Sequence, residues 1–93
     1  MKILQTATFQ KSLKKLHANQ KKDLDKAVKT IMNDPTIGES KVGDLSSVLV
    51  HKFKMIGCLS LLAYTYQEDV LTLTLLAIGS HENFYRDLKK SLK

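Results

Sequence analysis

Two lysines set two positions apart are the first candidates for chemistry. Lys52 and Lys54 lie in the stretch 48–55, which is rich in β-branched residues and alternates in polarity, a pattern typical of a strand. Residues at spacing two on a strand point to the same face, so we expect both ammonium groups to meet whatever lies over that face. Such a pair is suited to holding phosphate charge. The alternative is an edge strand whose lysines protect it from pairing with another chain.

The second candidate group is the segment Ser80-His81-Glu82-Asn83-Phe84-Tyr85-Arg86. An imidazole has an ordinary pKa near 6.5, so His81 needs little tuning to act as an acid or a base. Tyr85 could stack on or orient a nucleobase, and Arg86 adds a cation. The alternative is that His81 is a surface residue in the first turn of a helix and Tyr85 a packing aromatic with its hydroxyl in water.

Other kinds of active site lack support in the sequence. It contains no CxxC, HExxH, GxxxxGK[ST] or GxGxxG motif, so we expect neither a metal nor a nucleotide cofactor. Cys58 is the one cysteine, and its place beside a glycine at a strand start favours a structural role over a catalytic one. A single thiol cannot staple the fold and suits a reducing compartment.

Two helices are predicted in the first third of the chain, after a short edge strand at 2–5. The first helix is expected to be capped by Thr8 and the second by Asn19, since both are N-cap residue types. Pro35 disfavours helical geometry in the residue before it, so the second helix ends there. Apolar residues at spacings of three and four form one stripe on each helix. They are Phe9, Leu13, Leu16, Leu24, Val28 and Ile31.

Three strands and a last helix are predicted in the rest of the chain. A connecting loop at 36–47 is expected to lead to strands at 48–55, 58–66 and 70–78. The pattern of the last strand is typical of a central strand that helices cover on one face. Ser80 is expected to cap a C-terminal helix with a basic end. The order predicts a single α+β domain over residues 1–93. In it, an N-terminal helix pair packs on an antiparallel sheet that is followed by a C-terminal helix.

The charge balance predicts a polyanionic partner. Fifteen basic residues against nine acidic ones give a formal net charge of +6, and a basic domain of this kind attracts nucleic acid or acidic protein. Arg86 is the sole arginine, so attraction to a backbone is favoured over the reading of bases. The start of the chain lacks a signal-peptide pattern, and its charge-free runs are too short to span a bilayer. We therefore expect a cytoplasmic protein without membrane contact.

The layout and several segments resemble the RelE/ParE superfamily of bacterial type II toxin–antitoxin toxins over essentially the full chain. The segments are Lys52-Phe53-Lys54-Met55, the strand 59–66 and the stretch 75–89. Lys52 and Lys54 match the paired strand lysines of RelE-like members. His81 matches the histidine of the Gly-Ser-His motif of YafQ-like members, and Tyr85 falls where the terminal aromatic of that motif falls.

The resemblance implies two possible targets. RelE-like members are ribosome-dependent endoribonucleases that cut mRNA, whereas ParE-like members share the fold, lack that catalytic set and poison DNA gyrase. The strand after Gly57 lacks the arginine that RelE-like enzymes hold there, no histidine-rich loop precedes His81, and the last helix is expected to continue past Tyr85. The missing arginine favours the gyrase alternative, and the residues 52, 54 and 81 favour the nuclease. Either implies a cognate antitoxin, an acidic and apolar segment that folds on binding.

A third class, a lysine-rich RNA-binding domain without toxicity, ranks last. Its double-stranded RNA module has the order α-β-β-β-α and lacks the leading helix pair predicted here.

Overall fold

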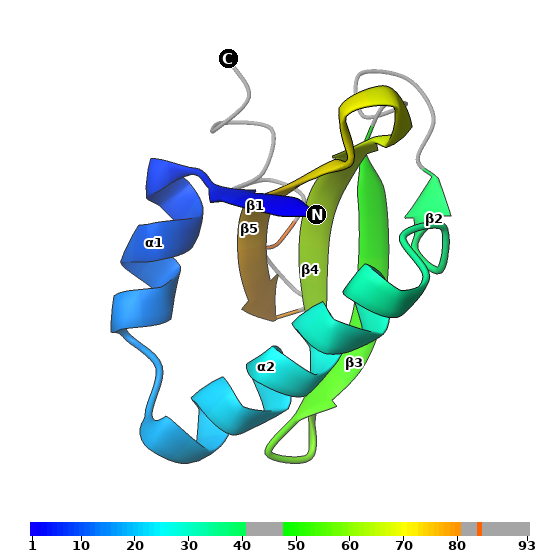
Figure 1. The fold of residues 1–93 in the computed structure, drawn as a ribbon. Coiled ribbons are helices and arrows are strands. Elements are labelled where there is room, and N and C mark those ends of the chain that lie inside the picture. Colours follow the sequence, from blue (N-terminus) through cyan, green and yellow to red (C-terminus); the bar gives the residue numbers. More distant parts are fainter. Residues whose placement is uncertain (41–47, 81–83, 85–93) are drawn as a thin grey trace.

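A computed structural model describes residues 1–40, 48–80 and 84 of the chain (Figure 1). The elements in this part are β1 (Lys2–Gln5), α1 (Ala7–Lys14), α2 (Ala18–Asn33), β2 (Glu39–Ser40), β3 (Leu49–Met55), β4 (Cys58–Gln67), a 3₁₀ helix (Glu68–Val70) and β5 (Thr72–Ser80). The mixed α+β class is therefore confirmed, while the C-terminal helix predicted after Ser80 lies outside the described residues. Within the described ranges, no helix is long and apolar enough to cross a membrane.

The strands form one sheet in the order β1-β5-β4-β3-β2. β3, β4 and β5 are consecutive antiparallel neighbours, as predicted, but β1 pairs with β5 in parallel. The expectation of a purely antiparallel sheet was thus wrong at its first strand. β1 and β5 are separated in the chain by both helices and by β2, β3 and β4. Parallel strands need such a long connection rather than a tight turn. The short β2, which pairs with β3 at Leu49 and Val50, lies in the segment predicted as a loop.

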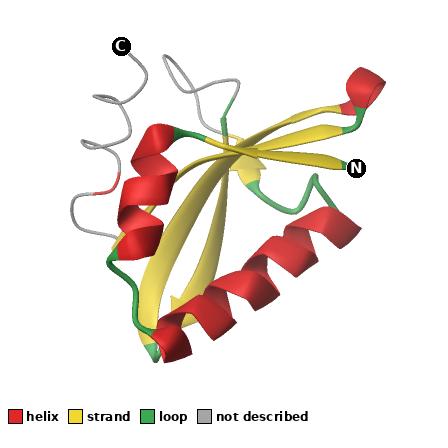
Figure 2. Ribbon diagram, turned by 60° about the vertical axis from the view of Figure 1, so that its left-hand side comes forward, coloured by secondary structure: helices red, strands yellow, loops and turns green. Residues whose placement is uncertain are grey.

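Both helices cover one face of the sheet (Figure 2). Phe9 of α1 and Leu24 and Ile31 of α2 are buried against Leu62 and Leu73 of the sheet. The remaining members of the predicted stripes, Leu13, Leu16 and Val28, pack around this cluster. Burial of each large apolar side chain stabilises the fold by roughly 1.5–3 kcal/mol. The helical spacing therefore predicted the buried face of both helices correctly.

The helix starts differ from those predicted. The Oγ1 of Thr6, rather than of Thr8, caps α1 by accepting the amide of Phe9 at 3.1 Å. The same hydroxyl donates to the carbonyl of Leu76 at 2.6 Å, so one side chain both starts the helix and ties it to β5. α2 begins after His17 instead of Asn19, and the backbone amide of His17 donates to the Gln20 side chain at 2.8 Å.

A second apolar cluster lies on the opposite face of the sheet. It comprises Val48, Val50, Leu61, Ala63, Leu76, Ala77 and Phe84. The β4–β5 register pairs Ala63 with Ala77 and Tyr64 with Leu75, and therefore skips Leu76. This bulge turns Leu76 and Ala77 to the same face, whereas strict alternation along the strand would put Ala77 on the face of Leu75. β5 continues through Ser80, two residues beyond the predicted strand end at 78, and the helix that Ser80 was predicted to cap lies outside the described residues.

Candidate functional site

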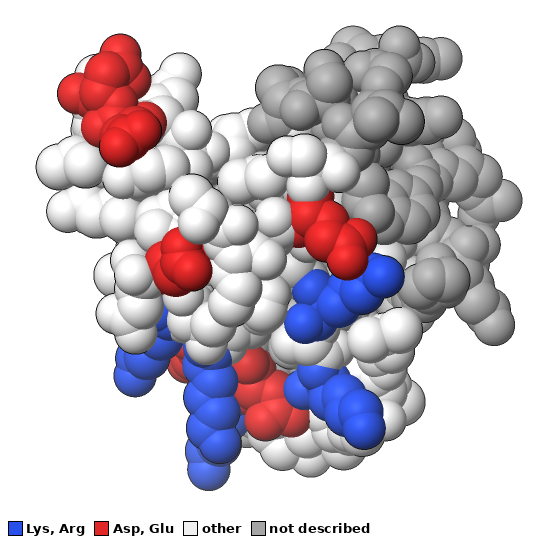
Figure 3. Space-filling model, turned by 90° about the vertical axis from the view of Figure 1, so that its right-hand side faces the viewer, with Lys and Arg blue, Asp and Glu red and all other residues white. Residues whose placement is uncertain are grey.

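Lys52 and Lys54 share one face of β3, as the alternation predicted. Along this strand Phe53 and Met55 pack against the cluster under the helices, and Val50 belongs to the cluster on the opposite face. Both lysines are exposed on that opposite face. Figure 3 faces the side of the molecule with β2 and β3, where basic side chains project into solvent with acidic side chains beside them. The structure thus presents two ammonium groups from adjacent outward positions of one strand.

Glu39 of the unpredicted strand β2 lies next to this pair. Its Oε2 is 4.0 Å from the Nζ of Lys52, and the two side chains are 63% and 47% exposed. An ion pair this exposed contributes only about 0–1 kcal/mol, so a phosphate can compete with it at little cost. Among the described residues, no carboxylate forms such a pair with Lys54.

The cross-strand neighbours of the lysines are apolar. Lys52 is opposite Leu61 and Lys54 is opposite Leu59 on β4. Leu61 is fully buried, whereas Leu59 is 46% exposed and offers an apolar surface beside Lys54. The arginine expected on this strand in RelE-like enzymes therefore has no counterpart here, and any further cation must come from another element.

The other three predicted site residues, His81, Tyr85 and Arg86, lie outside the described part of the chain. Two described residues, Ser80 and Phe84, flank His81 in the sequence. Ser80, directly before His81 in the sequence, ends β5 opposite Ser60 of β4. Phe84 is 3% exposed and belongs to the apolar cluster on the same face as the two lysines.

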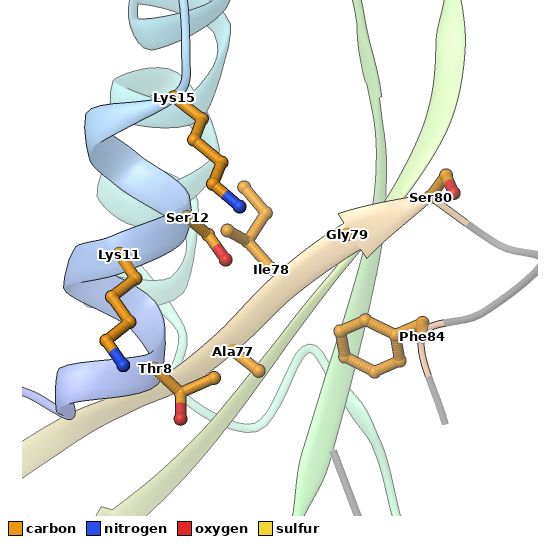
Figure 4. Close-up of a pocket in the computed structure, with 9 residues that line it drawn as sticks. All are labelled: Thr8, Lys11, Ser12, Lys15, Ala77, Ile78, Gly79, Ser80 and Phe84. Carbon is orange, nitrogen blue, oxygen red and sulfur yellow. The ribbon is translucent and has the colours of Figure 1, made fainter. Parts of the chain in front are cut away.

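A hollow between α1 and β5 was missed by sequence reasoning. It has a volume of about 350 Å³, and α1 lines it with Thr8, Lys11, Ser12 and Lys15 (Figure 4). The remaining wall is formed by the end of β5 and by Phe84. These four polar residues are separated by three, one and three positions in the sequence, which places them on one side of the helix. This spacing was the signal in the sequence for a shared polar side. The sequence did not show that this side faces a strand end.

His51 lies on the same strand as the lysines but turns to the helix side of the sheet. Its ring stacks on that of Phe53, with centroids 6.1 Å apart and planes 7° from parallel. Burial lowers the pKa of His51 below 6.5, because the charged imidazolium is poorly solvated there. His51 is thus separated by the sheet from the face that presents Lys52 and Lys54. In the described ranges, no three His, Cys, Asp or Glu side chains are grouped as metal ligands.

Comparison with known proteins identifies the family. The model of a ParE-like toxin of type II bacterial toxin–antitoxin systems matches residues 3–89. The chain belongs to this family. No curated protein sequence is similar enough to count as a relative of the toxin.

Solved structures of toxins share the fold of this chain. The chain in the intact RelBE toxin–antitoxin complex of E. coli superimposes with a TM-score of 0.70 at 17% identity, over 87% of the toxin and 96% of that chain. The YoeB/ParE toxin of Agrobacterium tumefaciens gives a TM-score of 0.71 at 14% identity, over 87% of the toxin and 99% of that chain. At these identities the likeness shows the fold alone. It does not separate mRNA cleavage from gyrase inhibition.

Proposed function

We propose that the toxin inhibits growth by ribosome-dependent cleavage of mRNA and that a cognate antitoxin neutralises it. The observation that carries this proposal is the exposure of Lys52 and Lys54 on one face of β3, away from both helices. Two like charges at adjacent outward positions repel each other unless an anion neutralises them. The phosphates of an RNA strand supply that charge at a regular spacing. The same activity places the toxin in the cytoplasm, with ribosomes and antitoxin.

The chemistry assigns a role to each residue. The 2′-hydroxyl oxygen attacks the adjacent phosphorus, the bond from phosphorus to the 5′-oxygen breaks, and a 2′,3′-cyclic phosphate and a 5′-hydroxyl result. One group must take the proton of the 2′-hydroxyl and one must protonate the leaving oxygen. His81 serves as the acid or base, while Lys52 and Lys54 stabilise the negative charge that develops on the phosphate. Tyr85 stacks on or orients a base, and Arg86 supplies additional positive charge.

Inhibition of DNA gyrase is the second candidate, and β4 supplies the observation that favours it. Leu59 and Leu61 stand across from the two lysines, where a RelE-like nuclease is expected to hold an arginine. A gyrase inhibitor binds a protein surface and needs neither an acid nor a base. The exposed Leu59 beside Lys54 is compatible with such a surface.

Expression of matched variants in cells separates the two functions. The wild type is compared with His81→Ala and with the double variant Lys52→Ala/Lys54→Ala. A second double variant, Lys22→Ala/Lys29→Ala, removes two exposed lysines of α2 as a control. The readouts are mapping of mRNA ends at ribosome-engaged codons and, in parallel, DNA breaks with induction of the DNA-damage response.

Each outcome decides between the candidates. The nuclease predicts mRNA cuts by the wild type and the control, and losses of about 10²–10⁴-fold in cleavage on removal of the acid–base residue. Growth inhibition should disappear in both site variants. DNA breaks without mRNA cuts would establish gyrase inhibition instead. Full toxicity and unchanged cleavage in both site variants would refute the residue assignment.

A further inference from the structure

Two hollows of opposite character meet at the end of β5. The first is the basic hollow of about 350 Å³ between α1 and β5. The second, of about 400 Å³, lies toward the start of β4 and is lined mainly by apolar side chains. Both have Ser12, Ile78, Gly79 and Ser80 in their walls. The two hollows therefore adjoin each other, and together they are called the depression here, with a basic half and an apolar half.

The basic half is suited to an anion. Lys11 lies in α1, and Lys15 directly follows the last residue of that helix as its C-cap. Figure 4 shows the side chains of Lys15 and Ser12 directed from α1 toward β5, with the ammonium of Lys11 beside Thr8. None of the described residues in this wall is a carboxylate. The ammonium groups of Lys11 and Lys15 and the hydroxyls of Thr8 and Ser12 are the hydrogen-bond donors that this wall offers to an anion.

A third hollow, on α2, shows that this charge pattern is specific. It is also rich in lysine, but Asp23 and Asp25 stand among the lysines Lys22, Lys26 and Lys29. Its positive charge is partly offset by these two carboxylates, and an incoming anion gains less there. Among its described wall residues, the basic half of the depression at β5 has no such carboxylate.

The apolar half is suited to a flat ring. Leu16, Met55 and Ile78 lie in its wall, and Ile56, which is 49% exposed, stands at the same place. Cys58, also exposed, is a further wall residue. Nucleobases combine a large apolar face with a few polar edge groups, and apolar contact with such a face is independent of base identity.

We propose that this depression binds one nucleotide of single-stranded RNA, with its phosphate on Lys11 and Lys15 and its base in the apolar half. A nucleotide joins a charged group and an apolar ring through a ribose, which matches the direct contact between the two halves. The inference rests on the proposed nuclease function. It adds a nucleotide subsite separate from the phosphate held by Lys52 and Lys54, which lie on the opposite face of the sheet from Met55.

The first test measures RNA binding without cleavage. A 2′-O-methyl RNA decamer cannot undergo attack by its 2′ oxygen, so its binding reports on the subsite and not on the acid or base. In fluorescence anisotropy at several salt concentrations, Lys11→Gln/Lys15→Gln should weaken binding and reduce the slope of log K against log salt by about 0.7, the value for one phosphate of a single strand. The matched control, Lys22→Gln/Lys29→Gln, should keep the slope of the wild type.

The second test uses Cys58 as a built-in reporter. It is the one cysteine of the chain and it is exposed in the apolar half. Bound decamer should slow its alkylation by iodoacetamide in the wild type and in the control, but not in Lys11→Gln/Lys15→Gln at the same decamer concentration. An acidic peptide of matched charge is added in a parallel reaction as the competing kind of ligand.

The outcomes separate this inference from the proposed function. Absence of binding by the wild type, an unchanged salt slope in the lysine variant, or unchanged alkylation of Cys58 in the bound state would each overturn the subsite. Protection by the acidic peptide alone would overturn it as well and would assign the depression to a protein partner. If mRNA is cleaved in cells and any of these results is found, the proposed nuclease function is retained and the proposed subsite is rejected. Absence of cleavage refutes the nuclease itself.

Discussion

His51 and its neighbour Lys52 lie on opposite faces of the same strand and therefore have different environments. Lys52 projects into solvent, whereas the His51 ring lies against Phe53 on the helix side of the sheet. The cost of burying a charged imidazolium lowers the pKa of His51 in the folded state. At a pH between that lowered pKa and about 6.5, the unfolded chain binds more protons at this position than the folded chain does.

The pH dependence of stability follows from this difference. The contribution of His51 favours folding above pH 6.5 and is lost as the pH falls through the window below that value. We expect the free energy of unfolding to fall more between about pH 7.5 and pH 5.5 in the wild type than in His51→Phe. Urea titrations of both proteins at the two pH values measure the effect. Equal losses in the two proteins would show that His51 is not the responsible group.

The positions of the candidate residues in the fold differ in how well they could be predicted from the sequence. The shared face of Lys52 and Lys54 follows from the period of two in a strand, a local rule that held. The site formed by Lys11 and Lys15 depends on the packing of α1 against the end of β5. That contact joins residues far apart in the chain, and no local pattern encodes it. The role of His81 stays a prediction.

At the scale of elements, Tyr64 holds the segment after α2 against the centre of the sheet. Its side chain is fully buried, and its hydroxyl donates to the carbonyl of Pro35 at 2.7 Å and accepts the amide of Gly38 at 2.9 Å. A Cβ at position 38 would lie 2.7 Å from that hydroxyl, so the close approach requires glycine. This contact positions the chain just before β2, whose Glu39 pairs with Lys52.

Removal of the Tyr64 hydroxyl should therefore loosen this connection. Tyr64→Phe leaves the amide of Gly38 and the carbonyl of Pro35 without their buried partner, which costs about 1–3 kcal/mol. The free energy of unfolding from urea titration measures the loss. Tyr66→Phe, two positions along the same strand, is the matched control and should change stability by less than about 0.5 kcal/mol. Equal effects of the two substitutions would contradict a special role for the Tyr64 hydroxyl.

The features that the sequence did not predict all depend on contacts between residues that are far apart in the chain. Threonine occurs at both 6 and 8, and Thr6 becomes the cap because it also reaches the carbonyl of Leu76 on β5. The two-residue strand β2 forms because it pairs with β3. The bulge at Leu76 forms because the register between β4 and β5 shifts there. The helices and long strands were predictable because apolar periodicity reflects a buried face. Bulges, caps and short edge strands carry no such periodic signal.

At the scale of the molecule, α1 and α2 cover one face of the sheet, and the lysines of the two candidate sites lie outside the core beneath these helices. Lys52 and Lys54 occupy the opposite face, and Lys11 and Lys15 stand at the margin between α1 and β5. The formal net charge of +6 is therefore spread over several surfaces. A partner that silences the toxin must neutralise this field, which favours an acidic antitoxin.

Association with the cognate antitoxin should consequently be sensitive to salt. Electrostatic steering raises association rate constants by about 10–10³-fold and is screened as ionic strength increases. We expect the association rate constant, measured by stopped flow, to fall about tenfold or more between about 50 and 500 mM salt, as the Debye length shortens. The dissociation rate constant should change less, because it depends on short-range contacts.

A charge variant tests the cause of this salt dependence. Lys14→Gln/Lys21→Gln removes two positive charges from exposed helical positions, so the association rate constant of this variant should depend less steeply on salt. An association rate constant that is independent of salt would mean that the antitoxin recognises the toxin through apolar contacts and that the basic surface serves the nucleic acid alone.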